Sequence, residues 1–434
     1  MRILFVRPNM SAGRSSDAME PLAFAILAGL TPSEIERKFL DERLEIIPLD
    51  EKADLLALSV ETFTARRAYQ IADAYRERGI PVVMGGFHPT FLPEEALEHA
   101  DAVVIGDAEE VWPRLLEDLR LGELKKTYRS EKASPLDGII FDRSIFQGKK
   151  YVPISPVQFG RGCKFACDFC SINAFYGSTL RQRPVKEVIE EIRSLKTRNI
   201  FFVDDNLFVD EAKTRELLES LIPLKVRWGC QISMDVASNP ALLDLMKQSG
   251  CMVAQTGFES LNKDNLGAMG KKANLKHFDE GGYLAAIEAL RKRGIMIYGT
   301  FVLGYDYDTP ESFLPTVAFA RKNKFFLANF NPLMTMPGTR LFKRLKEEGR
   351  LIHEQWWLAP DYRYGQAMFQ PGGMTPEQLT AGCFLARRRF NAFSSLLARF
   401  FSSANLRQSF LFFLANLISR REILGKQGHR LGEN

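Results

Sequence analysis

The chain has 434 residues, a hydrophobic fraction of 46% and a formal net charge of +5. This length predicts two or more domains, and the composition is that of a globular protein rather than a disordered or fibrous one. The opening MRILFVRPNM holds too short an apolar run for a secretory signal peptide, and no run reaches the roughly 20 apolar residues of a membrane helix. We therefore expect a cytoplasmic protein.

Residues 1–125 predict alternating strands and helices. The expected strands are 3–6, 55–60 and the starts of PVVMGGFH and DAVVIGDAEE, and the expected helix is 65–78. This alternation favours a doubly wound, Rossmann-like parallel sheet, whose ligands bind at the carboxyl ends of the strands. Such ends carry Gly85, Gly86, Gly106 and Glu109. His88 follows the glycine turn, and we expect it to be a capping or packing residue.

Residues 126–150 are polar and irregular, which predicts a linker. From 151 to 345 the chain alternates strand and helix six times, and the helical stretches have apolar residues at three- and four-residue spacing. The expected strands are VQFGRG, NIFFVDD, KVRWGCQIS, MVAQTGFES, MIYGTFVLG and FLANFNPLM. Six units are two short of a closed eightfold barrel, so we expect a partial TIM-type (β/α)6 barrel with its chemistry at the carboxyl ends of its strands.

Three cysteines follow the first barrel strand in the run FGRGCKFACDFC, at Cys163, Cys167 and Cys170. Three thiolates can hold three irons of a [4Fe–4S] cluster and leave the fourth iron open for a substrate. A structural zinc site normally needs four ligands, and the next cysteine along the chain is Cys230. A disulfide framework is not expected from six cysteines in 434 residues without a secretory context.

The C-x3-C-x2-C spacing, with Phe169 between the last two cysteines, resembles the signature of radical S-adenosylmethionine (radical SAM) enzymes. The resemblance implies that Cys163, Cys167 and Cys170 bind the cluster and are the catalytic and metal-binding residues. It also implies that the methionine part of SAM chelates the open iron and that Phe169 lies against the adenine. An external one-electron reductant of the flavodoxin or ferredoxin type would then start the cleavage of a carbon–sulfur bond.

Polar or glycine-rich segments that follow later barrel strands resemble the SAM contacts of the same family. Asp204, Asp205 and Asn206 follow the second strand, where the resemblance implies contacts to the methionine amino group. The resemblance assigns Glu259 and Ser260, after the fourth strand, to the ribose hydroxyls. It assigns the backbone from Gly299 to Gly304, after the fifth strand, to the adenine.

The first region resembles the cobalamin-binding-like domain that is fused to many radical SAM enzymes. The resemblance lies in PVVMGGFHPTFLPEEAL and DAVVIGDAEEVW. The D-x-H-x-x-G run, whose His ligates cobalt, is absent, and the loop after the first strand reads PNMSAGRSSDAMEP. The region also looks short, with little sequence between Ala28 and Leu44. Two interpretations of this region therefore remain open: a domain that binds cobalamin, or a vestigial sheet that only covers the barrel.

Two reactions on a small-molecule substrate fit these motifs. In the first, a 5′-deoxyadenosyl radical acts on an unreactive carbon, with methyl transfer from methylcobalamin or a rearrangement. In the second, cobalamin is absent and the 3-amino-3-carboxypropyl group of SAM passes to a soft acceptor such as arsenite. We expect Cys230, Cys251 and Cys383 to be small buried core residues. The alternative is that Cys230 and Cys251 are the substrate thiols of that reaction, because strand alternation could turn Cys230 toward the barrel lumen.

The missing histidine and the short first region favour the second reaction, whereas the family at large favours the first, so we expect a transferase of the first kind. A non-catalytic iron–sulfur electron carrier is a third hypothesis. The open iron site and the motifs for ribose and adenine argue against it.

Residues 346–434 predict an aromatic loop, WWLAPDYRYG, followed by two or three helices rich in Phe and Arg. Residues 375–434 contain nine Lys or Arg and three Glu, for a net charge of +6, whereas the rest of the chain sums to −1. We expect the loop to roof the active site and the helices to cover the barrel. Basic amphipathic helices can also lie on anionic lipid, which is the alternative. Nucleic acid is not an expected partner, because no RNA-binding module accompanies the charge.

Overall fold

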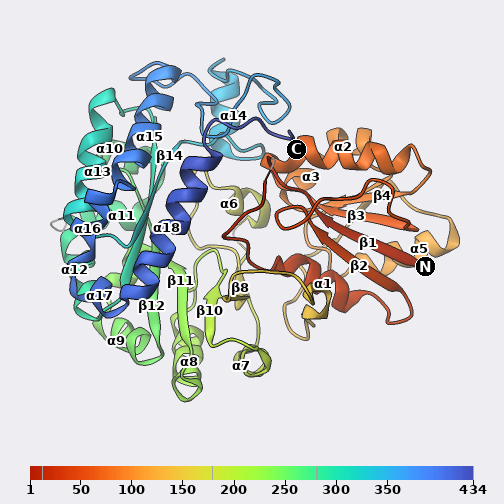
Figure 1. Ribbon diagram of the computed structural model, residues 1–434, viewed down its shortest axis with the longest axis horizontal. Helices are drawn as coiled ribbons and strands as arrows, with labels where there is room; N and C mark the ends of the chain where they lie inside the picture. The colour runs from red at the N-terminus through yellow and green to blue at the C-terminus, as the bar shows by residue number, and fades with distance from the viewer. Residues whose placement is uncertain (12, 178, 280–281, 434) are drawn as a thin grey trace.

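The structure is a computed structural model that describes residues 1–433 except 12, 178, 280 and 281. It contains two six-stranded parallel sheets, and a layer of helices at the carboxyl-terminal end of the chain covers the second sheet. The first sheet and its helices lie on the right in Figure 1, and the second sheet lies on the left. None of the helices in the described ranges is long and apolar enough to cross a membrane.

The first sheet has the strand order β2-β1-β3-β4-β5-β6, and every pairing in it is parallel. Its strands are β1 Arg2–Arg7, β2 Glu36–Asp41, β3 Leu55–Ser59, β4 Val82–Gly85, β5 Ala102–Ile105 and β6 Thr127–Arg129. Its helices are α1 Leu22–Leu30, α2 Ala65–Arg76, α3 Phe87–Phe91, α4 Pro93–His99 and α5 Trp112–Leu121. Separate apolar cores fill the two faces of the sheet, which confirms the expected doubly wound arrangement.

The first domain is not truncated, and this corrects the expectation of a short region. The stretch between Ala28 and Leu44 contains the edge strand β2, which pairs in register with β1 from Arg2 to Arg7. Its sequence ERKFLD combines charges with only two apolar residues, because an edge strand needs to bury one end only. Strand β6 also extends this sheet, although it lies inside the segment that we predicted to be a linker.

The second sheet has the order β14-β13-β12-β11-β10-β7, again with all pairings parallel. Its strands are β7 Ser155–Val157, β10 Asn199–Phe202, β11 Arg227–Ile232, β12 Cys251–Glu259, β13 Met296–Leu303 and β14 Leu327–Pro332. The helices between them are α6 Ser171–Tyr176, α7 Val185–Ser194, α8 Glu211–Leu221, α9 Pro240–Gln248, α10 Lys263–Ala268, α11 Lys272–Asp279, α12 Leu284–Lys292 and α13 Phe313–Lys322. This confirms the partial six-stranded barrel.

One expected barrel strand is divided into two. The run VQFGRG leaves the sheet after β7 and forms β8 Gly160–Arg161, which pairs antiparallel with β9 Arg181–Gln182. The three cysteines therefore follow β8 and lie in a loop that this two-stranded ribbon closes at its base. Helix α6 begins directly after the last of them.

The C-terminal helices cover one side of the barrel, as expected. Helix α14 is Arg340–Glu347, α15 is Pro376–Phe390, α16 is Phe393–Phe400, α17 is Ser403–Arg407 and α18 is Ser409–Lys426. The guanidinium of Arg399 is buried and donates to the carbonyls of Phe325 and Phe326, at distances of 2.8 and 2.7 Å. It also lies 3.9 Å from the ring centroid of Phe390, so one charged side chain joins α16 to α15 and to the start of β14.

The aromatic loop packs under the first domain, which corrects the expectation of a roof over the active site. Trp356 and Trp357 are at most 2% exposed and share an apolar core with α2. The indole N–H of Trp357 donates to Glu95 at 2.9 Å. Glu95 also lies 3.0 Å from His88 Nε2, and His88 is fully buried. His88 is thus a packing residue, as predicted.

Candidate functional site

The three cysteines lie in one loop, and Cys167 interacts electrostatically with the two others. Cys167 is 8% exposed, whereas Cys163 and Cys170 are partly buried. Burial raises the pKa of the Cys167 thiol to about 11, Lys271 opposes this rise, and the two other cysteines add to it. The described residues contain no set of three His, Cys, Asp or Glu side chains close enough to hold a single metal ion. The three thiols of one loop match the number of ligands of a [4Fe–4S] cluster with one open corner.

Two carboxylates at the end of β10 hold the backbone that leads into this loop. Asp204 accepts from the backbone N–H of Phe159 at 3.1 Å and from that of Gly160. Asp205 accepts from the backbone N–H of Gly162 at 2.9 Å. Burial raises the pKa of Asp204 to about 7, although the two backbone donors oppose this rise. Both side chains therefore position the cysteine loop, and their contact with SAM stays a prediction.

Asn206 reaches the loop itself. Its Nδ2 lies 4.0 Å from the sulfur of Cys163 and donates to the hydroxyl of Ser233 at 3.1 Å. Its Oδ1 accepts from the backbone N–H of Phe208 at 3.2 Å. The side chain is thus oriented from both ends, with its amide directed at a cysteine that we expect to bind iron.

Glu259 lies at the end of β12 and forms a buried ion pair with Lys271. The two side chains are 2.7 Å apart, and Glu259 has a left-handed backbone with φ of 61°. Burial alone would lower the pKa of Lys271, but the interactions with Glu259 and Cys167 hold this pKa above its ordinary value. A Cβ atom on Gly257 would lie 2.1 Å from Oε1 of Glu259, so this glycine leaves room for the carboxylate. Sequence reasoning missed Lys271, because GKK follows a short helix and has no motif.

The other predicted SAM contacts have clear packing roles. The hydroxyl of Ser260 accepts from the backbone N–H of Asn262 at 3.0 Å. A Cβ on Gly299 would lie 2.5 Å from the ring of Phe325, so this position faces the helices rather than the lumen. Gly304 has φ of 96° and donates its N–H to Asp308 at 2.9 Å. Their roles toward ribose and adenine stay predictions.

The segment between the second and third cysteines is fastened to the far end of the barrel. Phe169 packs against the main barrel core. Its neighbour Asp168 accepts from the hydroxyl of Tyr305 at 2.5 Å, and the carbonyl of Asp168 accepts from the N–H of Leu341 at 3.0 Å. The loop is therefore held from β10 on one side and from β13 and α14 on the other.

The remaining cysteines are core residues. Cys230 and Cys251 belong to the cluster between the sheet and the barrel helices, and their thiols interact with each other. Cys230 lies on the same side of β11 as Trp228, whose ring contacts Phe202 in that core. Cys230 therefore faces the helices, as expected for a core residue, and not the lumen, which argues against the alternative of a substrate thiol. Cys383, in α15, is also fully buried.

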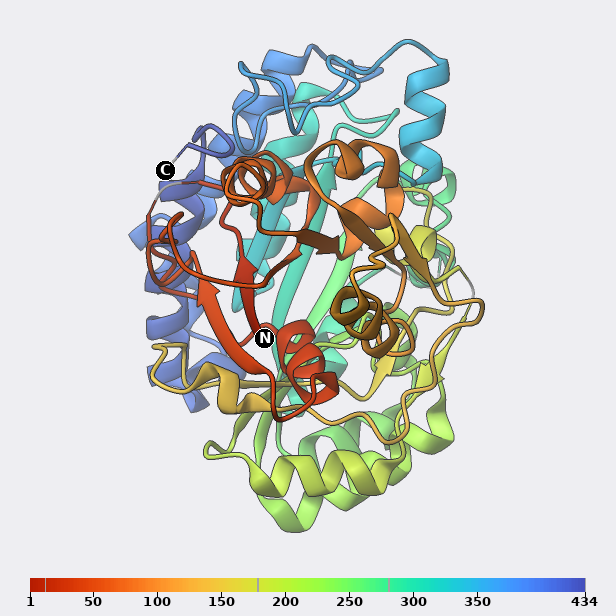
Figure 2. The ribbon, with the colours of Figure 1, turned by 90° about the vertical axis from the view of Figure 1, so that its right-hand side faces the viewer.

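Arg161, two residues before Cys163, joins the barrel to the first domain. It is 7% exposed, and its guanidinium lies 2.9 Å from Asp107 and 2.6 Å from Glu109, which both follow β5. Arg181 pairs with Asp107 as well. Burial opposes the charge, but the two carboxylates hold the pKa of Arg161 above its ordinary value. The carboxyl end of the first sheet therefore contacts the base of the cysteine loop, and in Figure 2 the first domain lies in front of the barrel.

A cavity of about 370 Å³ lies at this junction. It is lined by the ends of β5 and β6 from the first domain and by α6 and Arg181 from the barrel. Gly106 forms part of its wall with φ of 82°, and a Cβ there would meet nothing within 4 Å. An open backbone beside α6 suits a ligand that spans the first domain and the cysteine loop, so the residues present fit a corrin or its tail at this edge.

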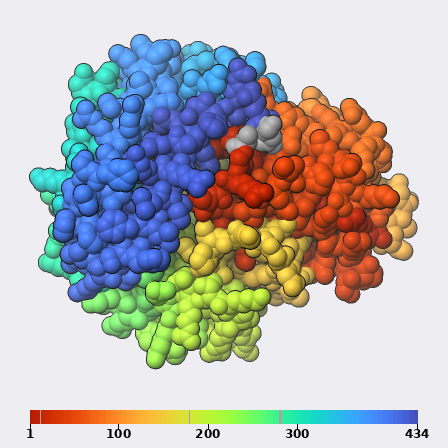
Figure 3. Space-filling model, viewed as in Figure 1, coloured from red at the N-terminus to blue at the C-terminus, as the bar shows by residue number. Residues whose placement is uncertain are grey.

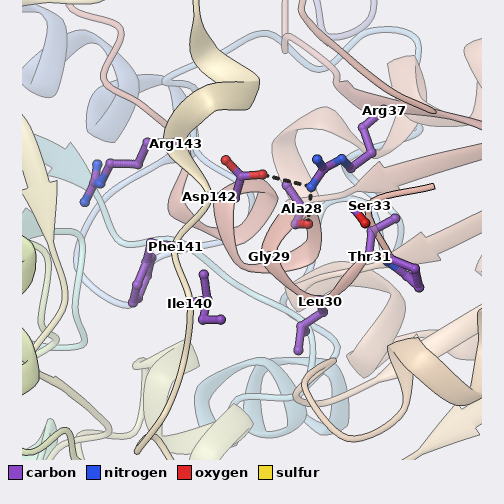
Figure 4. A pocket seen from close by; sticks show the side chains of 11 residues that line it. Ala28, Gly29, Leu30, Thr31, Ser33, Arg37, Ile140, Phe141, Asp142 and Arg143 are labelled. Atoms are coloured by element: carbon purple, nitrogen blue, oxygen red, sulfur yellow. Dashed lines mark hydrogen bonds and ion pairs between the residues drawn. The ribbon is translucent and has the colours of Figure 1, made fainter. Parts of the chain in front are cut away.

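A second cavity, of about 630 Å³, contains none of the predicted site residues. It lies between the end of α1 and residues 140–143. Figure 4 shows Arg37 bridging its two walls, with Nη1 2.7 Å from the carbonyl of Ala28 and 2.8 Å from Asp142. These polar groups satisfy one another, and we assign the cavity no role in the reaction.

We expect Glu259→Ala to weaken SAM binding about tenfold or more, because a hydrogen bond to a charged group contributes roughly 1.5–3 kcal/mol. Titration calorimetry under anaerobic conditions measures the affinity. Glu288→Ala is the matched control, since Glu288 pairs with Arg291 on the surface of α12. Equal affinity of the Glu259 variant and the control would remove Glu259 from the SAM site.

Comparison with known proteins identifies the two halves of the chain. The Radical SAM superfamily matches residues 157–320, and the B12 binding domain family matches residues 20–116. The chain is 31% identical to bacteriochlorophyllide d C-12(1)-methyltransferase of Chlorobaculum tepidum, over 96% of this chain and 93% of the relative. It is also 31% identical to bacteriochlorophyllide d C-8(2)-methyltransferase of the same organism, over 77% of this chain and 78% of the relative.

The fold agrees with that of a solved radical SAM methyltransferase, TsrM from Kitasatospora setae. The TM-score is 0.63 at 16% sequence identity, and the match covers 80% of this chain and 76% of that chain. The matches to the two methyltransferases of Chlorobaculum tepidum extend over most of both chains, so they establish the family of this chain. The chain belongs to the radical SAM superfamily with an N-terminal B12-binding domain, as a homologue of the B12-dependent radical SAM methyltransferases.

Proposed function

We propose that this methyltransferase places a methyl group on a carbon of a large, flat, mostly apolar small molecule of the bacteriochlorophyllide class. The observation that carries the proposal is the likeness to two enzymes that methylate bacteriochlorophyllide d at different carbons. That likeness extends over both domains and does not depend on the barrel alone.

The lumen side of the barrel sheet supports a substrate of this kind. The side chains that alternate with the buried core positions are partly exposed there, and two of them are aromatic: Phe201 and Tyr298. The hydroxyl of Tyr298 accepts from the amide of Asn329 at 2.7 Å, which holds the ring in place. The same side also carries the polar residues Gln255, Thr300 and Asn329, and such groups among aromatic side chains would fix the orientation of a ring system.

The residues at the site would hold and orient the reactants. When bound, the cluster supplies one electron to SAM, and cobalamin supplies the methyl carrier. We assign the cluster to Cys163, Cys167 and Cys170, whose loop is fixed by Asp204 and Asp205. The ion pair with Lys271 fixes the direction of the Glu259 carboxylate, whose oxygens can accept hydrogen bonds from a ribose.

The junction between the domains would bring the two cofactors together. The bridge from Arg161 to Asp107 and Glu109 fixes the first domain over the cysteine loop. We place the corrin at the neighbouring cavity and an external one-electron reductant, of the flavodoxin or ferredoxin type, on the exposed side of the loop. The competing transfer of an aminocarboxypropyl group to arsenite loses its expected thiols, since Cys230 and Cys251 are enclosed in the core.

A single anaerobic assay tests the proposed function. The reconstituted enzyme is supplied with dithionite, hydroxocobalamin, SAM labelled in its methyl group, and bacteriochlorophyllide d. We expect labelled methyl in the pigment and formation of 5′-deoxyadenosine, both lost when cobalamin is omitted. Release of 5′-methylthioadenosine instead would contradict the reaction. Cobalamin-dependent cleavage without methylated pigment would keep the reaction class and overturn the substrate.

A further inference from the structure

The C-terminal helices carry apolar side chains that the fold leaves exposed. The exposed residues are Phe393, Leu397 and Phe401 in and after α16, and Leu406, Phe410, Leu414 and Leu417 in α17 and α18. Phe410 is 80% exposed and Phe401 is 66% exposed, although both are large aromatic residues. We refer to these seven residues as the apolar stripe. Scattered exposed apolar residues are common, but a continuous set of seven on neighbouring helices is not.

The spacing places the members of the apolar stripe on one face of each helix. Its members recur at three- and four-residue intervals, which keeps them on one face of each helix. The opposite face is buried on the barrel, through Leu396 in α16 and Phe412 in α18. These helices are therefore seated on the protein by one face, and the other face is free.

Contacts between α16 and α18 place the two halves of the stripe side by side. The guanidinium of Arg420 lies 4.7 Å from the ring of Phe393, and the ring of Phe400 lies 4.7 Å from that of Phe413. The early part of α16 therefore meets the late part of α18, as in an antiparallel pair. In Figure 3 the dark blue C-terminal helices form one broad face on the left of the molecule.

Positive charge without negative charge accompanies the stripe. Residues 378–421 contain seven Arg and no Asp or Glu. Four of these arginines are exposed, and their side chains make no hydrogen bond or ion pair within the described part of the chain: Arg388, Arg389, Arg407 and Arg421. Arg407 lies one residue after Leu406, and Arg421 lies four residues after Leu417, so cations border both ends of the apolar residues on α17 and α18.

We propose that the face formed by α16, α17 and α18 binds the surface of a membrane that contains anionic lipid. Apolar side chains on one face with a border of free arginines are what an interfacial helix needs to enter the headgroup region. The helices would lie in the plane of the interface, because none of the described helices can span a bilayer. A second copy of this chain fits the face less well, since a twofold contact would bring the same arginines together.

This arrangement leaves the reaction site accessible. The helices pack at the amino-terminal ends of β13 and β14, through Met296, Phe326 and Leu327. The junction with the first domain is built from β5, β6 and α6 instead. Membrane contact through α16–α18 therefore does not require the cofactor cavity to close, and the proposal is independent of the substrate.

Vesicle co-sedimentation of the full chain tests this inference. We expect the protein to sediment with vesicles of phosphatidylcholine and phosphatidylglycerol, and to stay in solution with phosphatidylcholine alone or in high salt. Phe410→Glu should weaken binding at least tenfold. Each of Arg407→Gln and Arg421→Gln should weaken it about fivefold, the effect expected for one lost cation near an anionic surface. Leu284→Glu is the matched control, because Leu284 is similarly exposed, on α12.

Circular dichroism and the melting temperature show whether each variant is folded, and none of these side chains is buried. Equal sedimentation of the native chain with and without vesicles would overturn the proposal. Unchanged binding of the Phe410 variant, or equal loss in the Leu284 control, would do so as well. A concentration-dependent dimer that Phe410→Glu disperses, without any vesicle binding, would assign the face to a second copy instead.

Discussion

Cys167→Ala is expected to reduce methyl transfer below detection. Cys167 is the most buried of the three loop cysteines, and both of the others interact with it. Losing it would leave two thiols in the loop, too few to hold a cluster with a single open iron. Iron content, the visible absorption of the reconstituted protein and the amount of methylated product are the three measurements. Full turnover with a normal iron content would contradict the assignment of the loop.

Cys230→Ala is the control for this experiment. Cys230 is a buried thiol of the same barrel, but it lies between the sheet and the helices. We expect the variant to keep its iron and its turnover and to lose only about 1 kcal/mol of stability. Because the same residue was our candidate for a substrate thiol, loss of turnover with a normal iron content would restore that hypothesis.

Arg161→Met is expected to lower the free energy of unfolding by about 3–5 kcal/mol, the usual cost of removing one partner of a buried ion pair. The methionine fills most of the volume but leaves Glu109 without the cation that Arg161 supplies. Asp107 retains Arg181, so we expect the first domain to loosen and not to unfold. Chemical denaturation followed by circular dichroism measures the change, and SAM-dependent turnover should fall with it.

A surface arginine provides the comparison. Arg120 pairs with Glu117 on α5, and both side chains are more than half exposed. Arg120→Met removes the same chemical group and should leave both the unfolding curve and the turnover unchanged. If the two variants unfold alike, the bridge between the domains contributes nothing specific, and the rigid placement of the first domain would need another cause.

The regular parts of the fold were predictable from the sequence because they follow one repeating rule. Buried parallel strands are continuous apolar runs, and each barrel strand that we expected has a counterpart in the second sheet. The errors lie where a segment obeys a different rule. Strand β2 is a charged edge strand, and β6 has one buried residue, Tyr128, between two exposed ones. Neither pattern can be told from a loop without its neighbour in the sheet.

Only the part of the candidate site that carries a sequence motif was predictable. The cysteine spacing identified the loop, and the order of the later motifs located Asp204 and Glu259 near it. Lys271 and Arg161 were missed, because each acts through a partner that is distant in the sequence or in another domain. The direction of Cys230 was left open between core and lumen, since alternation tells which residues share a face but not which face points inward.

The charged contact at the domain junction also limits how this enzyme can be recombined. Arg161 and Arg181 come from the barrel, whereas Asp107 and Glu109 come from the first domain. A chimera could take its first domain from a relative with neutral residues at positions 107 and 109. Two guanidinium groups would then be buried at its domain junction without a carboxylate partner. Domain exchange between relatives should therefore succeed only when these four residues are exchanged together. Their joint presence in a relative would then indicate that its two domains were inherited together.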